Sequence, residues 1–273
     1  MIFQGSKAKY AESIVPRLQK IIDDNKIECY VEPFVGGANI IDKIHCQTKI
    51  GYDKNAPLIA LHQKAQKDFD GIPEHGTSEL WYRAKDAYRA AEGNPYDIQD
   101  NPEAPELWEI GAIAFLGSFN HGGFSRGYAK PEGERDPYNE AYRNLQKQAR
   151  SEEYKNIFFL WTPDYKNINK SPLLYNQKIL YYCDPPYEGT KPYGYAFETK
   201  FDYEEYWNWI RELSKTAFVI CSEQHFPNDF NILWEKDVNR TMSTSNKFKA
   251  VEKLGYYKDG LIKNEYSRIS RKI

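Results

Sequence analysis

The chain has 273 residues, of which 41% are hydrophobic and 15% aromatic, enough for a substantial core in one large domain with an inserted subdomain, or in two domains. Its formal net charge of −2 does not by itself indicate a polyanionic partner, and no apolar run approaches the length of a membrane span. The four cysteines lack metal-type spacing and the first residues lack a signal-peptide pattern, so we expect a reduced, cytoplasmic protein without a bound metal.

Residues 1–60 carry the pattern of half a nucleotide-binding βαβ unit. The glycines of its turn, Gly36 and Gly37, let the backbone approach a ligand closely, and Asp53 follows the second strand at a distance suited to ribose hydroxyls. An ordinary tight turn would have a similar composition. The predicted elements are a helix over 8–24, a strand over 28–31, a glycine turn over 32–39, a helical run to about residue 44 and a strand over 48–52.

The glycine turn departs from the dinucleotide fingerprint. Gly36-Gly37 is not G-x-G-x-x-G, and Glu32 adds a negative charge where a pyrophosphate would lie. A carboxylate there suits a cationic ligand that is rich in hydroxyls. S-adenosylmethionine, with its sulfonium, ammonium and free ribose, therefore fits this turn better than NAD does.

Residues 61–155 show no strand alternation and are predicted to form a mostly helical insertion. Helices are expected over 79–91, 106–117 and 137–150. The loop 117–130 contains no acid from 118 onward and combines glycines with hydroxyl, amide, aromatic and cationic side chains, which is the chemistry of phosphate and base contacts. A flexible glycine loop without a partner is the alternative. The candidate DNA-binding residues are Ser118, Asn120, His121, Arg126, Tyr128 and Lys130.

A predicted buried strand over 178–183 runs directly into Asp184-Pro185-Pro186-Tyr187. The two prolines end the strand and stiffen the chain, so this elbow lies at the carboxyl end of a strand, where open α/β sheets place ligands. The Asp184 carboxylate and the Pro185 carbonyl could accept both N–H bonds of an exocyclic amine on a planar heterocycle and free its lone pair, while Tyr187 stacks on the ring. A plain loop is the alternative interpretation.

The sheet continues on both sides of this elbow. Ten Lys or Arg residues against four Asp or Glu residues give 236–273 a net charge of +6, which is compatible with nucleic acid or with solvated surface charge. The other predicted elements are a strand over 156–161, a lid over 189–200, a helix over 203–215 capped by Asp202, a strand over 217–221 and a weakly strand-like segment over 232–257.

The order of these motifs resembles the DNA adenine-N6 methyltransferases of the Dam type, the D12 class in which the cofactor motif precedes the recognition region and D-P-P-Y follows it. The resemblance implies an α/β fold with a Rossmann-like S-adenosylmethionine-dependent methyltransferase sheet formed by 1–60 and 156–273, and a helical target recognition domain formed by 61–155. The matching segments are Gly5-Ser6-Lys7, 32–37, Asp53, Asp164-Tyr165, 184–187, 197–207, Ser222-Glu223 and 252–254.

The resemblance also implies residue roles. The matched cofactor positions are Gly5, Lys7, Glu32, Phe34, Gly36, Gly37, Asp53, Asp164 and Tyr165. The matched catalytic positions around the target base are Asp184, Pro185, Pro186 and Tyr187. The implied reaction is direct, in-line transfer of a methyl group from S-adenosylmethionine to N6 of an adenine flipped out of duplex DNA, without a covalent enzyme intermediate.

Several alternatives stay open at this stage. The elbow would handle any aryl amine, so N4-cytosine DNA methylation and N6-adenine RNA methylation are the competing reactions. A non-catalytic DNA-binding protein with a methyltransferase fold is the competing class. The loop 117–130 departs from the GATC-specific pattern, so the recognition word stays open. A cognate restriction endonuclease and a monomer or weak dimer are compatible with the resemblance.

Overall fold

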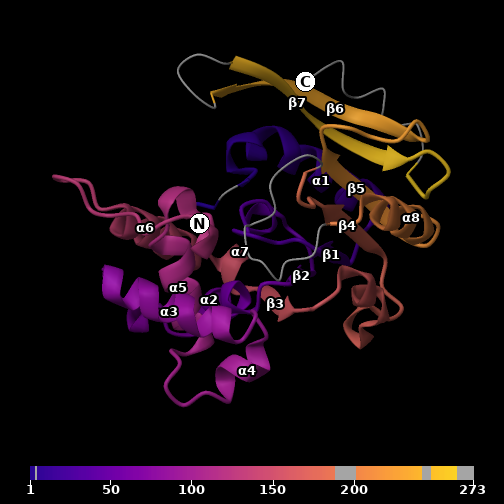
Figure 1. Cartoon of the computed structure of the whole chain (residues 1–273). Helices are drawn as coiled ribbons and strands as arrows, with labels where there is room; N and C mark the ends of the chain where they lie inside the picture. Colours follow the sequence, from indigo (N-terminus) through magenta and orange to yellow (C-terminus); the bar gives the residue numbers. More distant parts are fainter. Residues whose placement is uncertain (4, 188–200, 242–246, 263–273) are drawn as a thin grey trace.

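The computed structural model describes residues 1–3, 5–187, 201–241 and 247–262. Its strands form one seven-stranded sheet in the order β3-β2-β1-β4-β5-β7-β6 (Figure 1). The strands β1 to β5 are parallel, whereas β7 runs antiparallel to both β5 and β6. The strands are β1 (Cys29–Glu32), β2 (Thr48–Asp53), β3 (Ile157–Trp161), β4 (Ile179–Cys183), β5 (Phe218–Glu223), β6 (Phe230–Thr241) and β7 (Lys247–Tyr257).

The central strands are short apolar runs because both of their faces are covered. All residues of β1 and β5 are buried, as are four of the five in β4. The chain leaves β1 towards β2 on one side, and β4 pairs with β1 on the other. In open α/β sheets the crevice outside such a reversal of strand order is the usual ligand position, and here the reversal falls at the carboxyl ends of β1 and β4.

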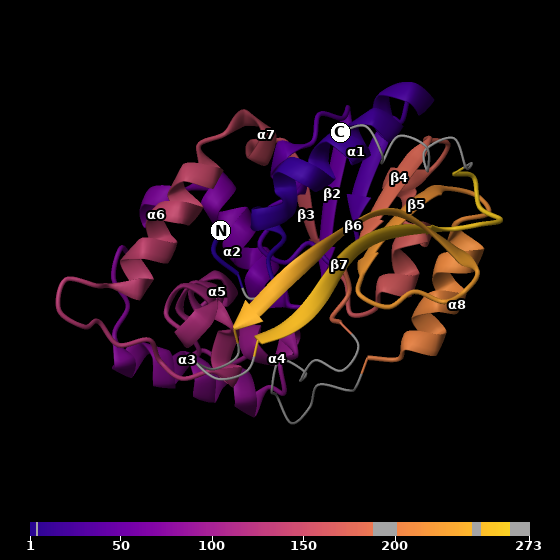
Figure 2. The ribbon, with the colours of Figure 1, turned by 90° about the horizontal axis from the view of Figure 1, so that it is seen from above.

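Helices cover the two faces of the sheet separately (Figure 2). The apolar side chains of α1 (Ala11–Asn25) and α2 (Ala56–Lys67) share one core with Tyr30 and Tyr182. On the other face, α8 (Tyr203–Leu213) packs with Tyr181 and Val219. The aromatic and apolar positions of α8 recur with helical period, and Asp202 caps its first turn by accepting from the Glu205 amide at 2.9 Å.

The region between β2 and β3 is helical, as the sequence predicts. Its helix α5 crosses α2 so closely that a Cβ on Gly111 would lie 2.1 Å from the Pro57 carbonyl oxygen. The predicted domain boundary at residue 60 falls inside α2, whose apolar residues join the sheet-side core and the helical core in one cluster. The elements of this region are α3 (Ser78–Ala90), α4 (Pro95–Gln99), α5 (Leu107–Leu116), α6 (Pro137–Ala149) and α7 (Glu152–Lys155).

Some elements differ from the sequence prediction. The helical run expected after the glycine turn is only a 3-10 turn over Ile41–Lys43, because the chain becomes extended at Ile44, where φ is −87° and ψ is 135°. The weakly strand-like end is a long β6–β7 hairpin that continues past the parallel strands towards the helical region (Figures 1 and 2). The predicted lid over 189–200 lies outside the described residues.

No helix in the described part of the chain is both long enough and apolar enough to span a bilayer.

Candidate active site

The glycine turn after β1 is held from two sides. Gly36 has a φ of +48°, which favours glycine, and its N–H donates to Oδ2 of Asp53 at 3.1 Å. Its carbonyl oxygen lies 2.8 Å from Nε2 of His62 on α2. The other carboxylate oxygen of Asp53 accepts from the Asn55 amide at 2.9 Å. Asp53, the acid predicted to bind ribose hydroxyls, therefore also fixes the conformation of the glycine turn.

His62 is a site residue that sequence reasoning did not find. Its ring is fully buried and stacked on Phe159, with centroids 4.4 Å apart and planes at 9°. Because Nε2 faces the Gly36 carbonyl it carries the proton, and Nδ1 accepts from the Tyr154 hydroxyl at 2.7 Å. Burial lowers the pKa of His62 to about 3, despite the hydrogen bond to Gly36, so the ring stays neutral. The sequence signal was a polar residue inside the apolar face of α2.

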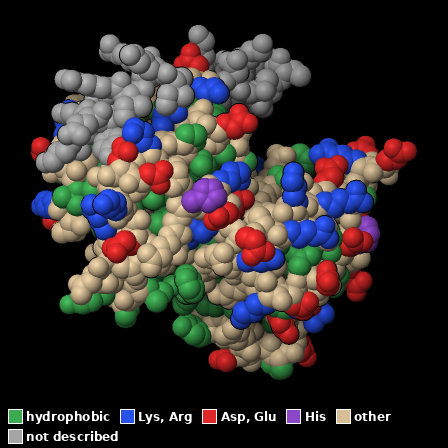
Figure 3. Space-filling view, turned by 180° about the vertical axis from the view of Figure 1, so that it is seen from behind, with side chains coloured by type: hydrophobic (Ala, Val, Ile, Leu, Met, Phe, Trp, Pro, Cys, Tyr) green, Lys and Arg blue, Asp and Glu red, His purple; other side chains and the backbone are tan. Residues whose placement is uncertain are grey.

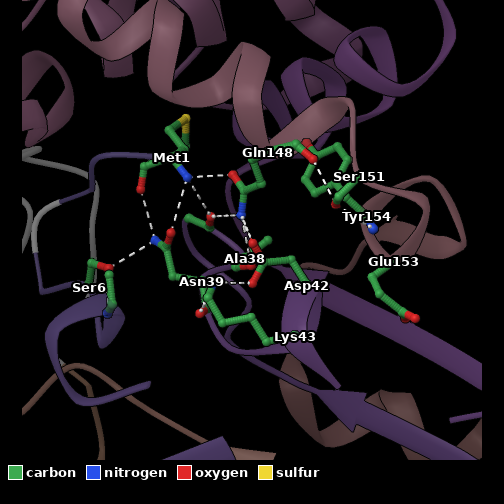
Figure 4. A network of polar contacts seen from close by, with 12 residues as sticks. Met1, Ser6, Ala38, Asn39, Asp42, Lys43, Gln148, Ser151, Glu153 and Tyr154 are labelled. Atoms are coloured by element: carbon green, nitrogen blue, oxygen red, sulfur yellow. Dashed lines mark hydrogen bonds and ion pairs between the residues drawn. The ribbon is translucent and has the colours of Figure 1, made fainter. Parts of the chain in front are cut away.

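A polar network joins the glycine turn to the first residues and to α6 (Figure 4). The Asn39 amide donates to the Met1 carbonyl and to Oγ of Ser6, both at 2.8 Å. From α6, the Gln148 amide donates to the Ala38 carbonyl at 2.9 Å. The side chain of Gln148 in the helical region therefore contacts the backbone of the glycine turn, so the position of α6 depends on the conformation of the turn.

The second glycine of the turn is required by this packing. A Cβ on Gly37 would lie 2.7 Å from the Asn39 amide nitrogen and 2.8 Å from Cβ of Phe3. Gly5 follows Phe3 closely in the chain; it is exposed and has a φ of +81°. The first residues therefore lie against the glycine turn. The match of Gly5-Ser6-Lys7 to a cofactor motif does not by itself predict these contacts.

Two acids, the buried Glu32 and the partly buried Asp53, lie at the carboxyl ends of β1 and β2. Glu32 accepts from the Tyr30 hydroxyl at 2.8 Å. Burial raises the pKa of Glu32 well above its usual range, with the Tyr30 hydrogen bond opposing the shift and Asp184 adding to it. Burial also raises the pKa of Asp53, against the hydrogen bonds from the Asn55 and Gly36 amides. Both acids would be stabilised as carboxylates by a cationic ligand.

Aromatic rings follow β1 and β3. The rings of Phe34 and Tyr165 are 5.3 Å apart and tilted by 47°, and both also contact Phe201. Asp164 fixes the start of the segment after β3 by accepting from the Lys166 amide at 2.9 Å. The hydroxyl of Tyr165 is buried and has no hydrogen-bond partner among the described residues. The structure brings together Phe34 and Tyr165, two of the predicted cofactor positions, and with them a donor group that a ligand could satisfy.

The elbow after β4 is rigid and charged. Asp184, 19% exposed, accepts from Nζ of Lys7 at 2.6 Å, and Lys7 is itself only 6% exposed. The same ammonium lies over the ring of Tyr187, 4.4 Å from its centroid. Burial raises the pKa of Asp184 to about 6, although Lys7 opposes this shift. The Tyr203 hydroxyl donates to the Pro186 carbonyl at 2.5 Å and fixes the second proline.

Tyr187 is held from beneath by the antiparallel strand β7. Its hydroxyl donates to Oε1 of Glu252, and Oγ of Ser222 donates to the same oxygen at 2.8 Å. Sequence reasoning noted both segments as family matches but assigned them no role. The pairing joins residues far apart in the chain, so no local pattern could have predicted it.

The candidate DNA residues of the loop 117–130 divide into two groups. Ser118 is fully buried and accepts from Nε1 of Trp81 at 3.0 Å, so in this structure its hydroxyl holds the loop and offers no surface to DNA. Tyr128 donates to the Gly76 carbonyl at 2.9 Å. The exposed candidates are Asn120, Arg126 and Lys130.

His121 is half-buried in this loop. Its Nδ1 lies 3.0 Å from the Phe115 carbonyl, and burial lowers its pKa. Asn120 and His121 both have positive φ, at +53° and +52°. On the face seen in Figure 3, Lys and Arg are interspersed with Asp and Glu over the helical region, so that face carries no single-sign patch.

Comparison of the sequence with protein families shows the class of chemistry. A sequence profile of the family described as D12 class N6 adenine-specific DNA methyltransferase matches residues 3–239, which include the glycine turn and the elbow. The type II methyltransferase M.MjaIII of Methanocaldococcus jannaschii is 23% identical over 236 residues, covering 74% of this chain and 73% of that protein. Among solved structures, the rRNA methyltransferase aviRa from Streptomyces viridochromogenes is similar with a TM-score of 0.35 and 10% identity, covering 88% of this chain and 84% of that chain.

Proposed function

The chain belongs to the D12 class N6 adenine-specific DNA methyltransferases, and on this premise we propose that its methyl donor is S-adenosylmethionine and its target an adenine flipped out of duplex DNA. The observation that carries the proposal is the position of Asp184. Its carboxylate is partly buried at the carboxyl end of β4, beside the reversal of strand order where the glycine turn after β1 also lies. Donor and acceptor would thus meet at the reversal of strand order.

The acceptor site works through hydrogen bonds. We propose that Asp184 and the Pro185 carbonyl accept the two N–H bonds of the adenine amine, which localises the nitrogen lone pair and directs it at the methyl group. In this structure the Lys7 ammonium occupies the carboxylate at 2.6 Å and covers one face of Tyr187. Oδ2 of Asp184 can still accept from the amine, but a base stacked on the covered face of Tyr187 would displace the ammonium, so we propose that Lys7 moves when the base enters.

The residues of the donor side fit S-adenosylmethionine. The buried Glu32 and the partly buried Asp53 suit its cationic and hydroxyl groups, and the rings of Phe34 and Tyr165 suit its adenine. When bound, it supplies an electrophilic methyl group on sulfur. The remaining predicted cofactor positions, for which the proposal rests on their place beside the turn or on the family resemblance, are Gly5, Lys7, Gly36, Gly37 and Asp164.

DNA recognition is assigned to the helical region, residues 61–155. Arg126 and Lys130 are exposed on its glycine loop and could pair with phosphates, while Asn120 could contact a base edge. These contacts would position the duplex, and the flipped base would enter the crevice from the same side.

The Asp184→Ala variant tests the proposal. It removes one of the two acceptors for the amine, so we expect methyl transfer to fall by a factor of about 10³ or more, beyond the range typical for one transition-state hydrogen-bond partner. S-adenosylmethionine binding, measured by calorimetry, should remain close to wild type. Asp184→Asn is the matched control, since it keeps an acceptor oxygen without the charge and should retain more activity than the alanine variant.

The product is identified by sequencing, with modification detection, of DNA from cells that express the chain. N6-methyladenine in one fixed word is the expected result. Methylation that persists near wild-type rates in Asp184→Ala would overturn the assigned role, and modified cytosine in place of adenine would overturn the assigned acceptor.

A further inference from the structure

One carboxylate oxygen of Glu252 accepts hydrogen bonds from two hydroxyl groups next to the elbow. Oε1 of Glu252 accepts from the Tyr187 hydroxyl and, at 2.8 Å, from Oγ of Ser222. The same oxygen lies 4.0 Å from Nζ of Lys7, the ammonium that is paired with Asp184. Glu252 is only 3% exposed, so these interactions are made away from water. It also lies beyond the residues 3–239 that the family profile matches.

The sheet explains how a residue so late in the chain reaches the elbow. In the antiparallel pair, Ser222 of β5 lies opposite Leu254 of β7, and side chains two apart on a strand point to the same face. Glu252 is therefore the diagonal neighbour of Ser222 on the face of Leu254. Because β7 runs opposite to β5, moving from Leu254 back to Glu252 leads towards the carboxyl end of β5 and so towards the elbow after β4.

The position of Lys7 creates a requirement that Glu252 meets. If the target base stacks on the face of Tyr187 that the Lys7 ammonium covers, the ammonium must move, and a buried cation left without a partner is strongly unfavourable. Oε1 of Glu252 is 4.0 Å away, against 2.6 Å for Asp184. A change in the Lys7 side-chain torsions would exchange one carboxylate for the other without exposing the charge.

We propose that Glu252 is a positioning residue of the acceptor site, which orients the ring of Tyr187 through its hydroxyl and receives the Lys7 ammonium when the target amine binds Asp184. The inference rests on the proposed function and deepens it. It assigns Glu252 to the entry of the base and not to the methyl donor, and this distinction separates it from a buried acid that only stabilises the fold.

The test compares Glu252→Gln with Glu235→Gln. The amide of the first variant still offers an oxygen to Tyr187 and Ser222 but cannot balance Lys7, whereas Glu235 is an exposed acid on β6, opposite Lys253 of the same hairpin. We expect methyl transfer by Glu252→Gln to fall roughly 10- to 100-fold, the range for losing one buried charged partner. Flipping, followed by the fluorescence of 2-aminopurine at the target position, should weaken in parallel. The affinity for S-adenosylmethionine should stay within about twofold, as expected for a site that the variant does not touch, and Glu235→Gln should match wild type.

A double variant separates the charge role from a purely structural one. In a Lys7→Met background there is no ammonium to receive, so adding Glu252→Gln should change base flipping by no more than about twofold. Glu252→Asp keeps the charge and should recover part of the flipping that Glu252→Gln loses. If Glu252→Gln melts too early to assay, Tyr187→Phe, which removes one hydrogen bond from the same oxygen, should lower turnover while cofactor affinity is unchanged.

The inference is overturned if Glu252→Gln flips and methylates the target like wild type, or if its effect is the same with and without Lys7. It is also overturned if cofactor affinity falls as much as turnover does. Absence of adenine methylation by the wild-type chain in the same assay would instead refute the proposed function, so the two failures are distinguishable.

Discussion

The substitution His62→Gln is expected to destabilise the fold by an amount that depends on pH. The histidine donates from Nε2 to the Gly36 carbonyl, accepts at Nδ1 from the Tyr154 hydroxyl and stacks on Phe159. A glutamine amide can reproduce the Nε2 donor but not the Nδ1 acceptor or the ring. The variant therefore keeps the hydrogen bond to the glycine turn and loses the other two interactions.

The structure sets the magnitude at neutral pH. A buried hydroxyl left without its acceptor costs about 1–3 kcal/mol, and a lost ring stack adds about 0.5–1.5 kcal/mol. Their sum, about 1.5–4.5 kcal/mol, is a large share of the roughly 5–15 kcal/mol that stabilises a typical domain. We expect the variant to fold, with a clearly lower midpoint of urea unfolding.

The pH dependence follows from the lowered pKa of His62. Burial holds the pKa of His62 at about 3 in the folded state, against 6.5 for an unperturbed histidine. Between these two pH values the unfolded state therefore binds a proton that the folded state does not. Wild-type stability therefore loses about 1.4 kcal/mol per pH unit from this group as the pH falls through that window, and the loss is absent in His62→Gln. Between pH 7.5 and pH 5 the gap between the two proteins should narrow by about 2 kcal/mol.

Urea unfolding of both proteins at pH 7.5 and pH 5 measures this change. Tyr154→Phe is the control, because it removes the hydroxyl and retains the histidine, so its penalty should not narrow in the same way at low pH. A gap between wild type and His62→Gln that is constant or wider at pH 5 would refute the assignment of a neutral, desolvated ring.

Three other consequences can be measured independently. Gly111→Ala should destabilise the α2–α5 packing by about 1–3 kcal/mol, because its Cβ would lie 2.1 Å from the Pro57 carbonyl oxygen; a melting temperature equal to that of wild type would contradict this close approach. Replacing Arg126 and Lys130 by glutamine should lower DNA affinity and reduce the slope of log affinity against log salt by about 2, since each phosphate contact contributes about 0.9; an unchanged slope would move the DNA-binding face elsewhere. The pKa of about 6 at Asp184 predicts that kcat/KM falls as the pH drops below about 6, because protonation removes the negative charge of the acceptor and occupies one of its oxygens; an acid limb of the kcat/KM profile near the ordinary carboxyl pKa would show that burial does not govern the pKa of Asp184 in the free enzyme.

The parts of the fold that could be predicted are those with local signals. The strands β1, β4 and β5 are short apolar runs ended by Glu32, by Pro185 and by Glu223, and they lie within a residue or two of the predicted bounds. Helix α2 was missed although Asn55 caps it by accepting from the Leu58 amide. Its apolar residues pack against both the sheet side and α5, so they surround the helix and blur its 3.6-residue period.

The prediction failed where a tertiary contact overrides local preference. The sequence after the glycine turn favours a helix, but Ala38 takes a positive φ and the side chain of Asn39 bonds to the Met1 carbonyl. The side-chain amide of Gln148, more than a hundred residues away, donates to the Ala38 carbonyl at 2.9 Å and so holds the turn in this conformation. The partners in each of these hydrogen bonds, Asn39 with Met1 and Gln148 with Ala38, are too far apart in the sequence for a local pattern to contain both.

The candidate site shows the same division between local and distant information. The stiffness and charge of the elbow follow from Asp184 and two adjacent prolines, so the sequence was sufficient to predict them. The electrostatic state of that acid depends on Lys7, 177 residues earlier, and on Glu252. Strand order brings both there: β4 lies between β1 and β5, and β7 reverses direction beside β5. If β7 ran parallel to β5, the residues that precede Leu254 would lie towards the amino end of β5, away from the elbow, and Lys7 would have no second carboxylate there. The antiparallel end of an otherwise parallel sheet therefore supplies the second carboxylate on which the proposed movement of Lys7 depends.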